Sequence, residues 1–254
     1  GRLGLRYEHL TCATWLNPDN AVESSIRDDF EASLAAVVGM MLRGEVSAGA
    51  WKVLSSGKVT CFEKKPDAKG VRGVRPIVAV ETLVKVAGKT LLTRLSTDEP
   101  DQLEDLRGAN QAGAGRKGGM EALVHSAQEL FDRASANNAA ECGRRQGLMV
   151  MDGANAFGEI NRETMLNTVA KKCPMMYPFT RAMYGQTNTV TVNGTDLEVS
   201  RGVLQGDSMA PLLHAAVLHE VYEKLNTDLR DATTTMFYAD DGTVFGDVAD
   251  LKKV

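Results

Sequence analysis

Cysteine, histidine and aromatic residues are scarce in this chain of 254 residues. Its four cysteines lie far apart, with neither a CxxC pair nor a neighbouring set of histidines. The sequence therefore indicates neither a zinc site nor a disulfide framework, and it fits a reducing compartment. No apolar run approaches the length of a membrane span, and the first residues lack a signal-peptide pattern. We therefore expect no membrane partner and no secretion.

Aromatic residues make up only 6% of the chain, although 43% of it is hydrophobic. Much of the core must then come from Leu, Val, Ala and Met, and the total is enough for one large domain or two small ones. Because the sequence has no initiator Met and stops soon after its last motif, we expect it to be a piece of a longer protein.

Positive charge is in deficit overall, since the formal net charge is −4, and this argues weakly against a nucleic-acid partner. The distribution is uneven. Between Lys52 and Arg94, ten basic residues face three acidic ones, so this stretch carries +7 and the remainder −11. A basic segment on an acidic body suits a polyanion that approaches from one side. A solvated surface of mixed sign would explain the charges alone equally well.

The hydrophobic pattern predicts a mixture of helices and strands, without an internal repeat or a dividing linker. Helical spacing covers residues 24–42, where Ile26, Phe30 and Leu34 suggest an amphipathic helix, and it returns over 81–96, 120–135, 161–172 and 207–225. Asn161 and Asp207 are the expected caps of the last two helices.

Strands are expected at four places, which makes the fold class α+β. Two strands joined by a Pro/Gly/Lys turn fall within residues 57–80, and a single apolar strand covers 147–152. Hairpins are predicted over 187–200 and 233–246, and the Asn193–Gly194 turn of the first is the strongest local signal of this kind.

Two adjacent acids lie in the last hairpin, within "FYADDGTVF" at residues 237–245. Like charges repel by about 1 kcal/mol at 4 Å in water, and by more where water is excluded. Asp-Asp-Gly alone is typical of a tight turn, because Asp and Gly favour positive φ. However, Asp152 ends the apolar strand "GLMVMD", where a sheet would deliver a third acid to the same edge. Grouped carboxylates are tolerable when hard divalent cations neutralise them, and two such ions can hold both oxygens of a phosphoryl transfer.

Six segments in chain order resemble the reverse transcriptase domain of non-LTR (LINE-type) retrotransposons. One four-letter box is a weak signal, whereas six ordered motifs at plausible spacing are specific. The segments are "GLRYEHL", "KKPDAKGVRGVRPIVAVETLVKVAGK", "NQAGAGRKGGMEALVHS", "MDGANAFGEINR", "RGVLQGDSMAPLL" and "FYADDGTVF".

The resemblance implies an RNA-directed DNA polymerase that adds dNTPs to the 3′-hydroxyl of a DNA primer on an RNA template. It implies two Mg²⁺ ions, with Mn²⁺ as a possible substitute, and metal-mediated nucleotidyl transfer. By resemblance, Asp152 and Asp240 bind the two catalytic ions, while Asp241 supports the site and can touch metal.

The resemblance also implies contacts with the nucleotide and the primer. Phe157 matches the aromatic residue under the incoming sugar, where bulk favours deoxynucleotides. Gln205 and Gly206 match the pair that contacts nucleotide and template, and Tyr238 is expected beneath the primer end. Arg75 matches the arginine that meets the triphosphate, for which a planar guanidinium is suited.

A companion lysine for the triphosphate is expected in the turn between the first two strands. Lys64, Lys65 and Lys69 are all candidates, and the turn length leaves the choice open.

The implied fold is a right-hand polymerase with fingers and palm, an antiparallel palm sheet packed on helices, and no thumb. An N-terminal extension and fingers would occupy residues 1–145, and the palm 146–254, with a fingers insertion at about 165–200. The missing thumb leads us to expect weak template-primer affinity and poor processivity, so that the isolated chain is weakly active or inactive. The family implies a nuclear or cytoplasmic site of action.

Two other functions fit parts of the sequence. A non-catalytic scaffold that binds RNA or protein would typically have lost the catalytic acids, and all three are present here. An RNA-templated RNA polymerase would need room for the 2′-hydroxyl, which Phe157 opposes. The "GAGRKGG" stretch does not fit a P-loop, so we expect a loop near the template strand. His214 is predicted to be a packed core histidine.

Overall fold

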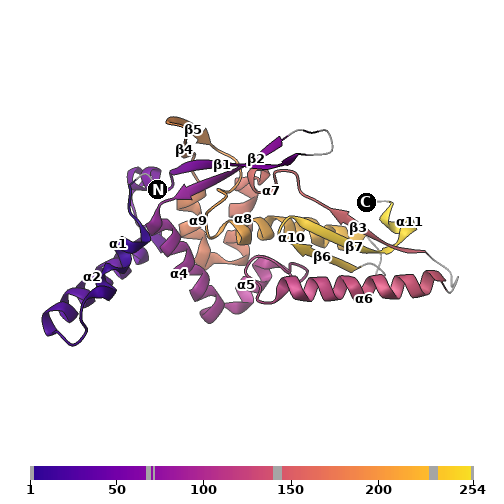
Figure 1. Ribbon diagram of the computed structural model, residues 1–254, viewed down its shortest axis with the longest axis horizontal. Coiled ribbons are helices and arrows are strands. Elements are labelled where there is room, and N and C mark those ends of the chain that lie inside the picture. The colour runs from indigo at the N-terminus through magenta and orange to yellow at the C-terminus, as the bar shows by residue number, and fades with distance from the viewer. Residues whose placement is uncertain (1–2, 67–69, 71, 140–144, 229–233, 253–254) are drawn as a thin grey trace.

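The structure, a computed structural model, describes residues 3–66, 70, 72–139, 145–228 and 234–252. Two separate sheets are joined by a central group of helices, and one long helix projects from this body (Figure 1). The candidate Lys69 lies outside the described residues. In the described part of the chain, no helix is both long enough and apolar enough to cross a lipid bilayer.

The first sheet combines two segments that are distant in the chain, in the strand order β2-β1-β4-β5. β1 (Gly57–Pro66) and β2 (Arg72–Val80) form an antiparallel hairpin. β4 (Asn188–Val192) pairs in parallel with β1 and in antiparallel with β5 (Thr195–Val199). The predicted β4–β5 turn is confirmed, and both Asn193 and Gly194 take the positive φ that a two-residue hairpin of this kind needs.

The second sheet is antiparallel throughout and has the order β3-β7-β6. Its strands are β3 (Gln146–Met151), β6 (Thr234–Tyr238) and β7 (Asp241–Asp247). The β6–β7 turn consists of Ala239 and Asp240, with φ of +54° at Ala239. The turn expected at Asp240–Gly242 therefore begins one residue earlier and ends two residues earlier than the sequence indicated. The prediction relied on Asp and Gly to supply the positive φ, which Ala239 takes instead.

Helices fill the space between and beneath the sheets. In Figure 1, α8, α9 and α10 occupy the centre and α6 runs below the three-stranded sheet. Their bounds are α1 (Tyr7–Thr11), η1 (Cys12–Trp15), α2 (Ala21–Leu42), α3 (Ala48–Leu54), α4 (Thr82–Asp98), α5 (Pro100–Arg107), α6 (Gly119–Ala139), α7 (Ala156–Glu159), α8 (Arg162–Lys172), η2 (Pro174–Met176), α9 (Tyr177–Tyr184), α10 (Ala210–Asp228) and α11 (Val248–Leu251).

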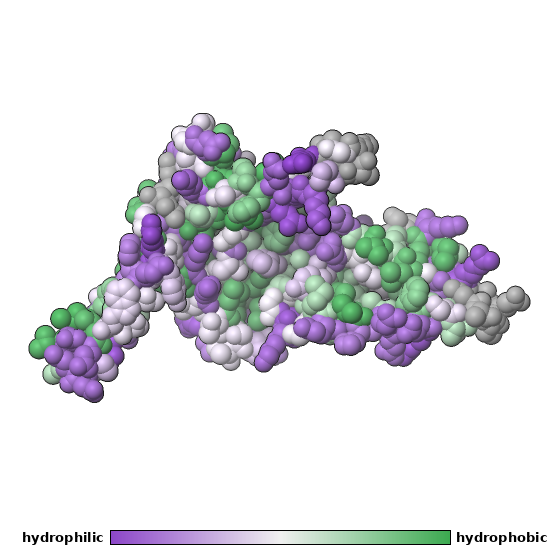
Figure 2. All heavy atoms as spheres, viewed as in Figure 1, coloured by the Kyte–Doolittle hydropathy of each residue, from purple (hydrophilic) through white to green (hydrophobic). Residues whose placement is uncertain are grey.

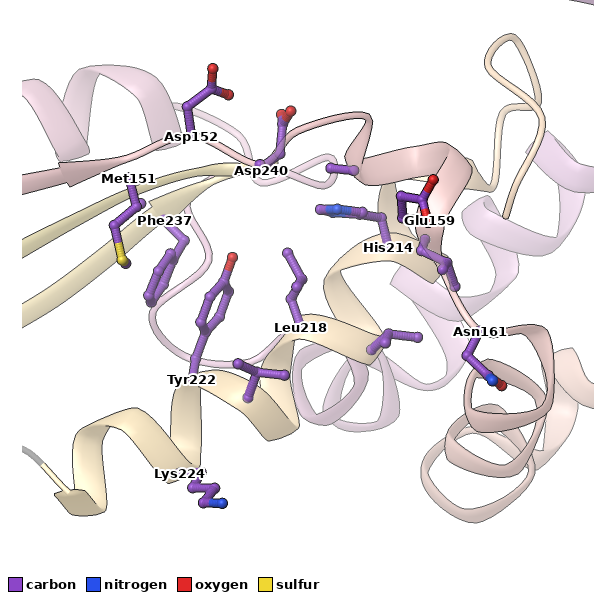
Figure 3. Close-up of a pocket in the computed structure, with 16 residues that line it drawn as sticks. Met151, Asp152, Glu159, Asn161, His214, Leu218, Tyr222, Lys224, Phe237 and Asp240 are labelled. Carbon is purple, nitrogen blue, oxygen red and sulfur yellow. The ribbon is translucent and has the colours of Figure 1, made fainter. Parts of the chain in front are cut away.

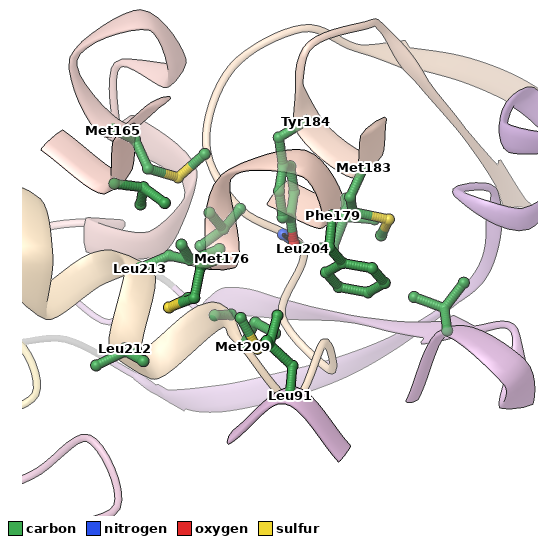
Figure 4. Packing of buried hydrophobic residues seen from close by; sticks show 14 of the residues in the cluster. Leu91, Met165, Met176, Phe179, Met183, Tyr184, Leu204, Met209, Leu212 and Leu213 are labelled. Carbon is green, nitrogen blue, oxygen red and sulfur yellow. Dashed lines mark hydrogen bonds between the residues drawn. The ribbon is translucent and has the colours of Figure 1, made fainter. Parts of the chain in front are cut away.

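The main core lies where α4, α8, α9 and α10 meet (Figure 4). Leu91, Met165, Met176, Phe179 and Met183 are almost completely buried there, and each contributes roughly 1.5–3 kcal/mol through removal of its apolar surface from water. The flexible thioether side chains suit irregular gaps between packed helices. The predicted reliance on aliphatic residues and Met is confirmed.

Two predicted helices differ from the structure. The N-terminal half of α2 projects from the body, so Ile26 is 54% exposed instead of packed (Figure 1). The N-terminus of α2 is nevertheless capped, because the Asn20 side chain accepts hydrogen bonds from Val22 N and Glu23 N. α10 begins at Ala210, three residues after the expected cap Asp207. By contrast, the predicted Asn161 cap of α8 is confirmed by its bond to Thr164 N.

Candidate active site

Two sheet edges deliver Asp152 and Asp240 to neighbouring positions. Asp152 directly follows β3, whose last residue Met151 lies opposite Gly242 at the start of β7. A Cβ atom placed on Gly153 would lie 3.3 Å from Cβ of Asp240, so the two acidic segments approach closely. Both carboxylates project to the same side in Figure 3.

Cations of the described residues do not neutralise these acids. In the part of the chain that the structure describes, no Lys, Arg or His forms an ion pair with Asp152, Asp240 or Asp241. The pKa of Asp241 is raised, first by desolvation and then by the charges of Asp240 and Asp152. Among these described residues, no three His, Cys, Asp or Glu side chains converge as a ready-made metal site. The uncompensated carboxylate oxygens are nevertheless the ligand type that Mg²⁺ prefers.

A cleft of about 470 Å³ collects most of the residues singled out in the sequence. It is lined from both sheets, from the β3–α7 segment and from the loop before α10. The lining includes Lys64, Arg75, Asp152, Phe157, Gln205, Gly206 and Asp240. Asp241, Lys65 and Tyr238 do not line it. The chain therefore brings these segments together from positions far apart in the sequence, while their roles remain predictions.

The loop that carries Gln205 and Gly206 is fixed against β2. Val78 N donates a hydrogen bond of 2.6 Å to Gln205 O. Gly206 has φ of +120°, and a Cβ there would lie 2.3 Å from Val78 O. Both the backbone conformation and the close approach therefore require glycine. The Gln205 side chain is left with a buried Oε1 that has no partner among the described residues.

A buried tyrosine–aspartate pair supports the same loop from behind. Tyr184 Oη donates a hydrogen bond of 2.5 Å to Asp207 Oδ2, and Leu204 N donates to Tyr184 Oη at 3.3 Å. Asp207 Oδ1 accepts a bond from Met209 N. Burial raises the pKa of Asp207, although the Tyr184 hydroxyl and the Met209 amide oppose this shift. The sequence presented Asp207 only as a cap, because nothing local indicates its distant partner.

An arginine beside this pair joins three segments. Arg162 is 8% exposed, and its guanidinium donates to Gly202 O and Gln186 O, both at 2.8 Å. Its central carbon lies 5.2 Å from the centre of the Tyr184 ring. Arg162 thus ties the start of the Gln205 loop to α8 and α9.

Phe157 lies on α7 at the side of the cleft. Its ring stacks on the ring of His214 from α10, with centroids 4.8 Å apart and planes inclined by 24°. His214 is buried, as predicted, and burial lowers its pKa while the charge of Asp240 opposes that shift. The histidine is therefore also a platform for Phe157, a role that the sequence did not indicate.

A second, apolar cavity of about 600 Å³ adjoins the acids on the α10 side (Figure 3). Leu218 and Val221 of α10 line it together with Phe237 of β6. Tyr222 stacks on Phe237 with centroids 3.2 Å apart, and burial raises the pKa of its hydroxyl, with a further contribution from Asp240. Asp152 and Asp240 thus separate a polar cleft from an apolar cavity.

An antiparallel sheet that carries acids at a strand end and at a hairpin turn, backed by helices, is the architecture of a polymerase palm. Residues 63–250 match the family model described as reverse transcriptase (RNA-dependent DNA polymerase), so the chain belongs to this family. The non-LTR type within this family stays a prediction.

Solved structures agree at the level of the fold. Apo telomerase from Candida tropicalis is 12% identical, with a TM-score of 0.53 over 82% of this chain and 42% of the telomerase. A form truncated from its C-terminal domain gives 12% identity and a TM-score of 0.50, over 79% and 45%. The predicted α+β fingers-and-palm fold is thereby confirmed. This chain spans less than half of either telomerase chain, and no curated protein matches it.

Proposed function

We propose that this chain is the RNA-directed DNA polymerase domain of a non-LTR retroelement, which adds dNTPs to a DNA primer on an RNA template. One observation carries the proposal: Asp152 and Asp240 line the same cleft as Arg75, Phe157 and Gln205. The acids at one end of the cleft would hold the metal ions at the reacting phosphate. Arg75 would contact the other phosphates, and the Phe157 ring would lie next to the sugar. The family match supports the same class of reaction.

In this proposal, the acids hold divalent cations. Asp152 and Asp240 would bind Mg²⁺ or Mn²⁺, because both carboxylates project to one side and neither is paired with a cation of the described chain. When bound, such ions activate the primer 3′-hydroxyl and stabilise the charge on the leaving pyrophosphate. Asp241 adds negative charge next to them, since it begins β7 immediately after the turn.

The β1–β2 hairpin would hold the triphosphate. Lys64 and Arg75 line the cleft, whereas Lys65, the next residue on β1, does not. Successive side chains of a strand point to opposite faces, which accounts for the difference. Replacing Lys64 by Ala should therefore raise the KM for dNTP by roughly tenfold. The matched Lys65→Ala change should leave the KM for dNTP within about twofold of the wild-type value. An equal effect of the two changes would contradict the proposal that Lys64, and not Lys65, contacts the triphosphate.

Phe157 would exclude ribonucleotides by occupying the space next to the sugar. Its stacking on buried His214 fixes the ring, so the wall of the cleft is rigid on this side. A rigid wall is needed for discrimination, because a mobile ring could move aside for the 2′-hydroxyl.

An RNA template would lie along the basic hairpin. Hydrophilic residues gather over the outer end of β1–β2 in Figure 2, and Phe62 opposite Arg75 is 55% exposed. Cations that track a phosphate backbone, together with an exposed aromatic ring on which a base can stack, are typical of single-strand binding.

Primer extension tests the proposal. The chain would be incubated with a primed RNA template, dNTPs and Mg²⁺, and we expect addition of a few nucleotides that Asp240→Asn abolishes. Asp29→Asn, an exposed change on the projecting helix α2, removes the same charge and should not affect extension. Binding of RNA without extension, by the folded wild-type chain with the thumb restored, would instead favour the non-catalytic scaffold. Equal use of rNTPs and dNTPs would favour an RNA polymerase.

A further inference from the structure

The glycine-rich segment at residues 108–119 lies along the outer edge of β6. Phe237 N donates a hydrogen bond to Asn110 O at 2.9 Å, and Ala112 N donates to Phe237 O at 2.7 Å. The Asn110 side chain adds a bond of 2.8 Å to Thr235 Oγ1. The segment thus extends the palm sheet by a short parallel bridge and covers an edge strand next to the acidic turn.

The side chain of Gln111 reaches from this segment to the β6–β7 turn. Its Oε1 accepts hydrogen bonds from Ala239 N at 2.8 Å and from Gly113 N at 2.9 Å. Its Nε2 donates to Ala239 O at 3.1 Å. Gln111 is 2% exposed, so these bonds form away from water, where an unmade bond is costly. One amide therefore pairs with the backbone of Ala239 in both directions.

Ala239 needs such support. Its φ of +54° is a left-handed conformation that an Ala residue adopts only when neighbouring contacts hold it there. Gly113 is fitted closely to the same contact, since a Cβ there would lie 2.8 Å from Ala239 N and 2.9 Å from Gln111 Oε1. The residue that follows Ala239 is Asp240.

The segment is itself anchored on α5. Arg107, which is 6% exposed, donates from Nε to Ala114 O at 3.2 Å and pairs with Glu104. Arg116 pairs with the other oxygen of the same Glu104. Because the segment is fixed on both sides of Gln111, its amide is presented to the turn in one orientation.

We infer that Gln111 is a positioning residue, which fixes the Ala239–Asp240 turn so that the Asp240 carboxylate is held beside Asp152. The inference rests on the proposed function for its catalytic consequence. The contact itself is independent of catalysis. Gln111 does not line the cleft that contains Asp152 and Asp240. It acts through the backbone of Ala239.

The first test compares Gln111→Met, which keeps the shape but removes all three hydrogen bonds, with Gln128→Met on the exposed face of α6. Amide hydrogen exchange of Ala239 is expected to accelerate by about tenfold or more in Gln111→Met alone. The Val244 amide in the middle of β7 should change little. Mn²⁺ binding, followed by the EPR signal of the free ion, should weaken by roughly tenfold because Asp240 loses its fixed position.

A second variant reaches the same contact from the other side. Gly113→Ala places a methyl group against Ala239 N and Gln111 Oε1, so it should reproduce both effects if Gln111→Met does not fold. Unchanged exchange at Ala239, or equal acceleration at Ala239 and Val244, would overturn the inference. Extension assays should show a lower kcat with an unchanged KM for dNTP. Absence of extension by the wild-type chain with the thumb restored would refute the proposed function only, since exchange and Mn²⁺ binding would still decide the role of Gln111.

Discussion

Replacing Tyr184 by Phe should destabilise the protein most strongly at high pH. The change removes one hydroxyl, which donates to buried Asp207 and accepts from Leu204 N. Loss of a hydrogen bond to a charged group costs about 1.5–3 kcal/mol, and the orphaned Leu204 amide adds about 1 kcal/mol. A total of about 3 kcal/mol corresponds to a fall in Tm of roughly 6–12 °C for a chain of this size.

The pH dependence follows from the raised pKa of Asp207. Because its pKa in the folded protein lies above the unfolded value, the folded state binds more protons between the two values, and stability falls as pH rises through that window. The Tyr184 hydroxyl lowers this pKa, so its removal should raise the pKa further. The decrease in the free energy of unfolding caused by Tyr184→Phe should therefore be large at about pH 8 and smaller at about pH 5.

Denaturant unfolding of wild type and variant at both pH values would measure this difference. Tyr177→Phe is the matched control, because its hydroxyl has no hydrogen bond among the described residues. Adding Asp207→Asn to Tyr184→Phe should recover part of the stability at about pH 8, since a neutral amide costs less to bury than an unpaired carboxylate. An equal loss at both pH values, or no recovery in the double variant, would refute the reasoning.

Three further outcomes are expected. Phe157→Ala should reduce the preference for dNTP over rNTP by about tenfold or more in extension assays. An unchanged ratio would contradict the proposal that Phe157 excludes the 2′-hydroxyl. Gly206→Ala should cost roughly 1–3 kcal/mol in unfolding experiments, because its Cβ would meet the Val78 carbonyl at a positive φ. Arg162→Lys should cost roughly 2–4 kcal/mol, since a single ammonium cannot reproduce both carbonyl bonds, and full stability would show that those bonds are replaceable.

Local signals identified the elements that carry the site. The apolar strand before Asp152, the Asn193–Gly194 turn and the Asn161 cap are each determined by neighbouring residues, and each is present where expected. The motif order identified the reverse transcriptase family. Most of the residues that it singled out line one cleft, whereas Asp241, Lys65 and Tyr238 do not. Pairs formed across the chain were not predictable. Nothing near Asp207 indicates Tyr184, because the hydrogen bond depends on how α9 packs behind the loop.

The turn at Ala239 shows a second limit of local reasoning. Intrinsic preference favours Asp or Gly at positive φ, yet Ala239 takes this conformation because Gln111 pairs with its backbone. The projecting half of α2 shows a third limit. Helical spacing predicts a face that can be buried, but only the tertiary arrangement determines whether anything lies against it.

The pairing of β1 with β4 has a consequence for biosynthesis. Gly57 and Lys58 lie opposite Val190 and Thr191, so the edge of β1 stays open while the ribosome adds the palm strand β3 and the helices α8 and α9. Pairing between strands that are distant in the chain requires closure of a long loop, which slows folding. The unpaired edge of β1 is exposed until that pairing forms. The sheet that would hold the triphosphate therefore cannot be completed before the ribosome has synthesised much of the palm. If the segment with β1 and β2 and the segment with β4 and β5 are expressed separately, we expect aggregation instead of two folded domains.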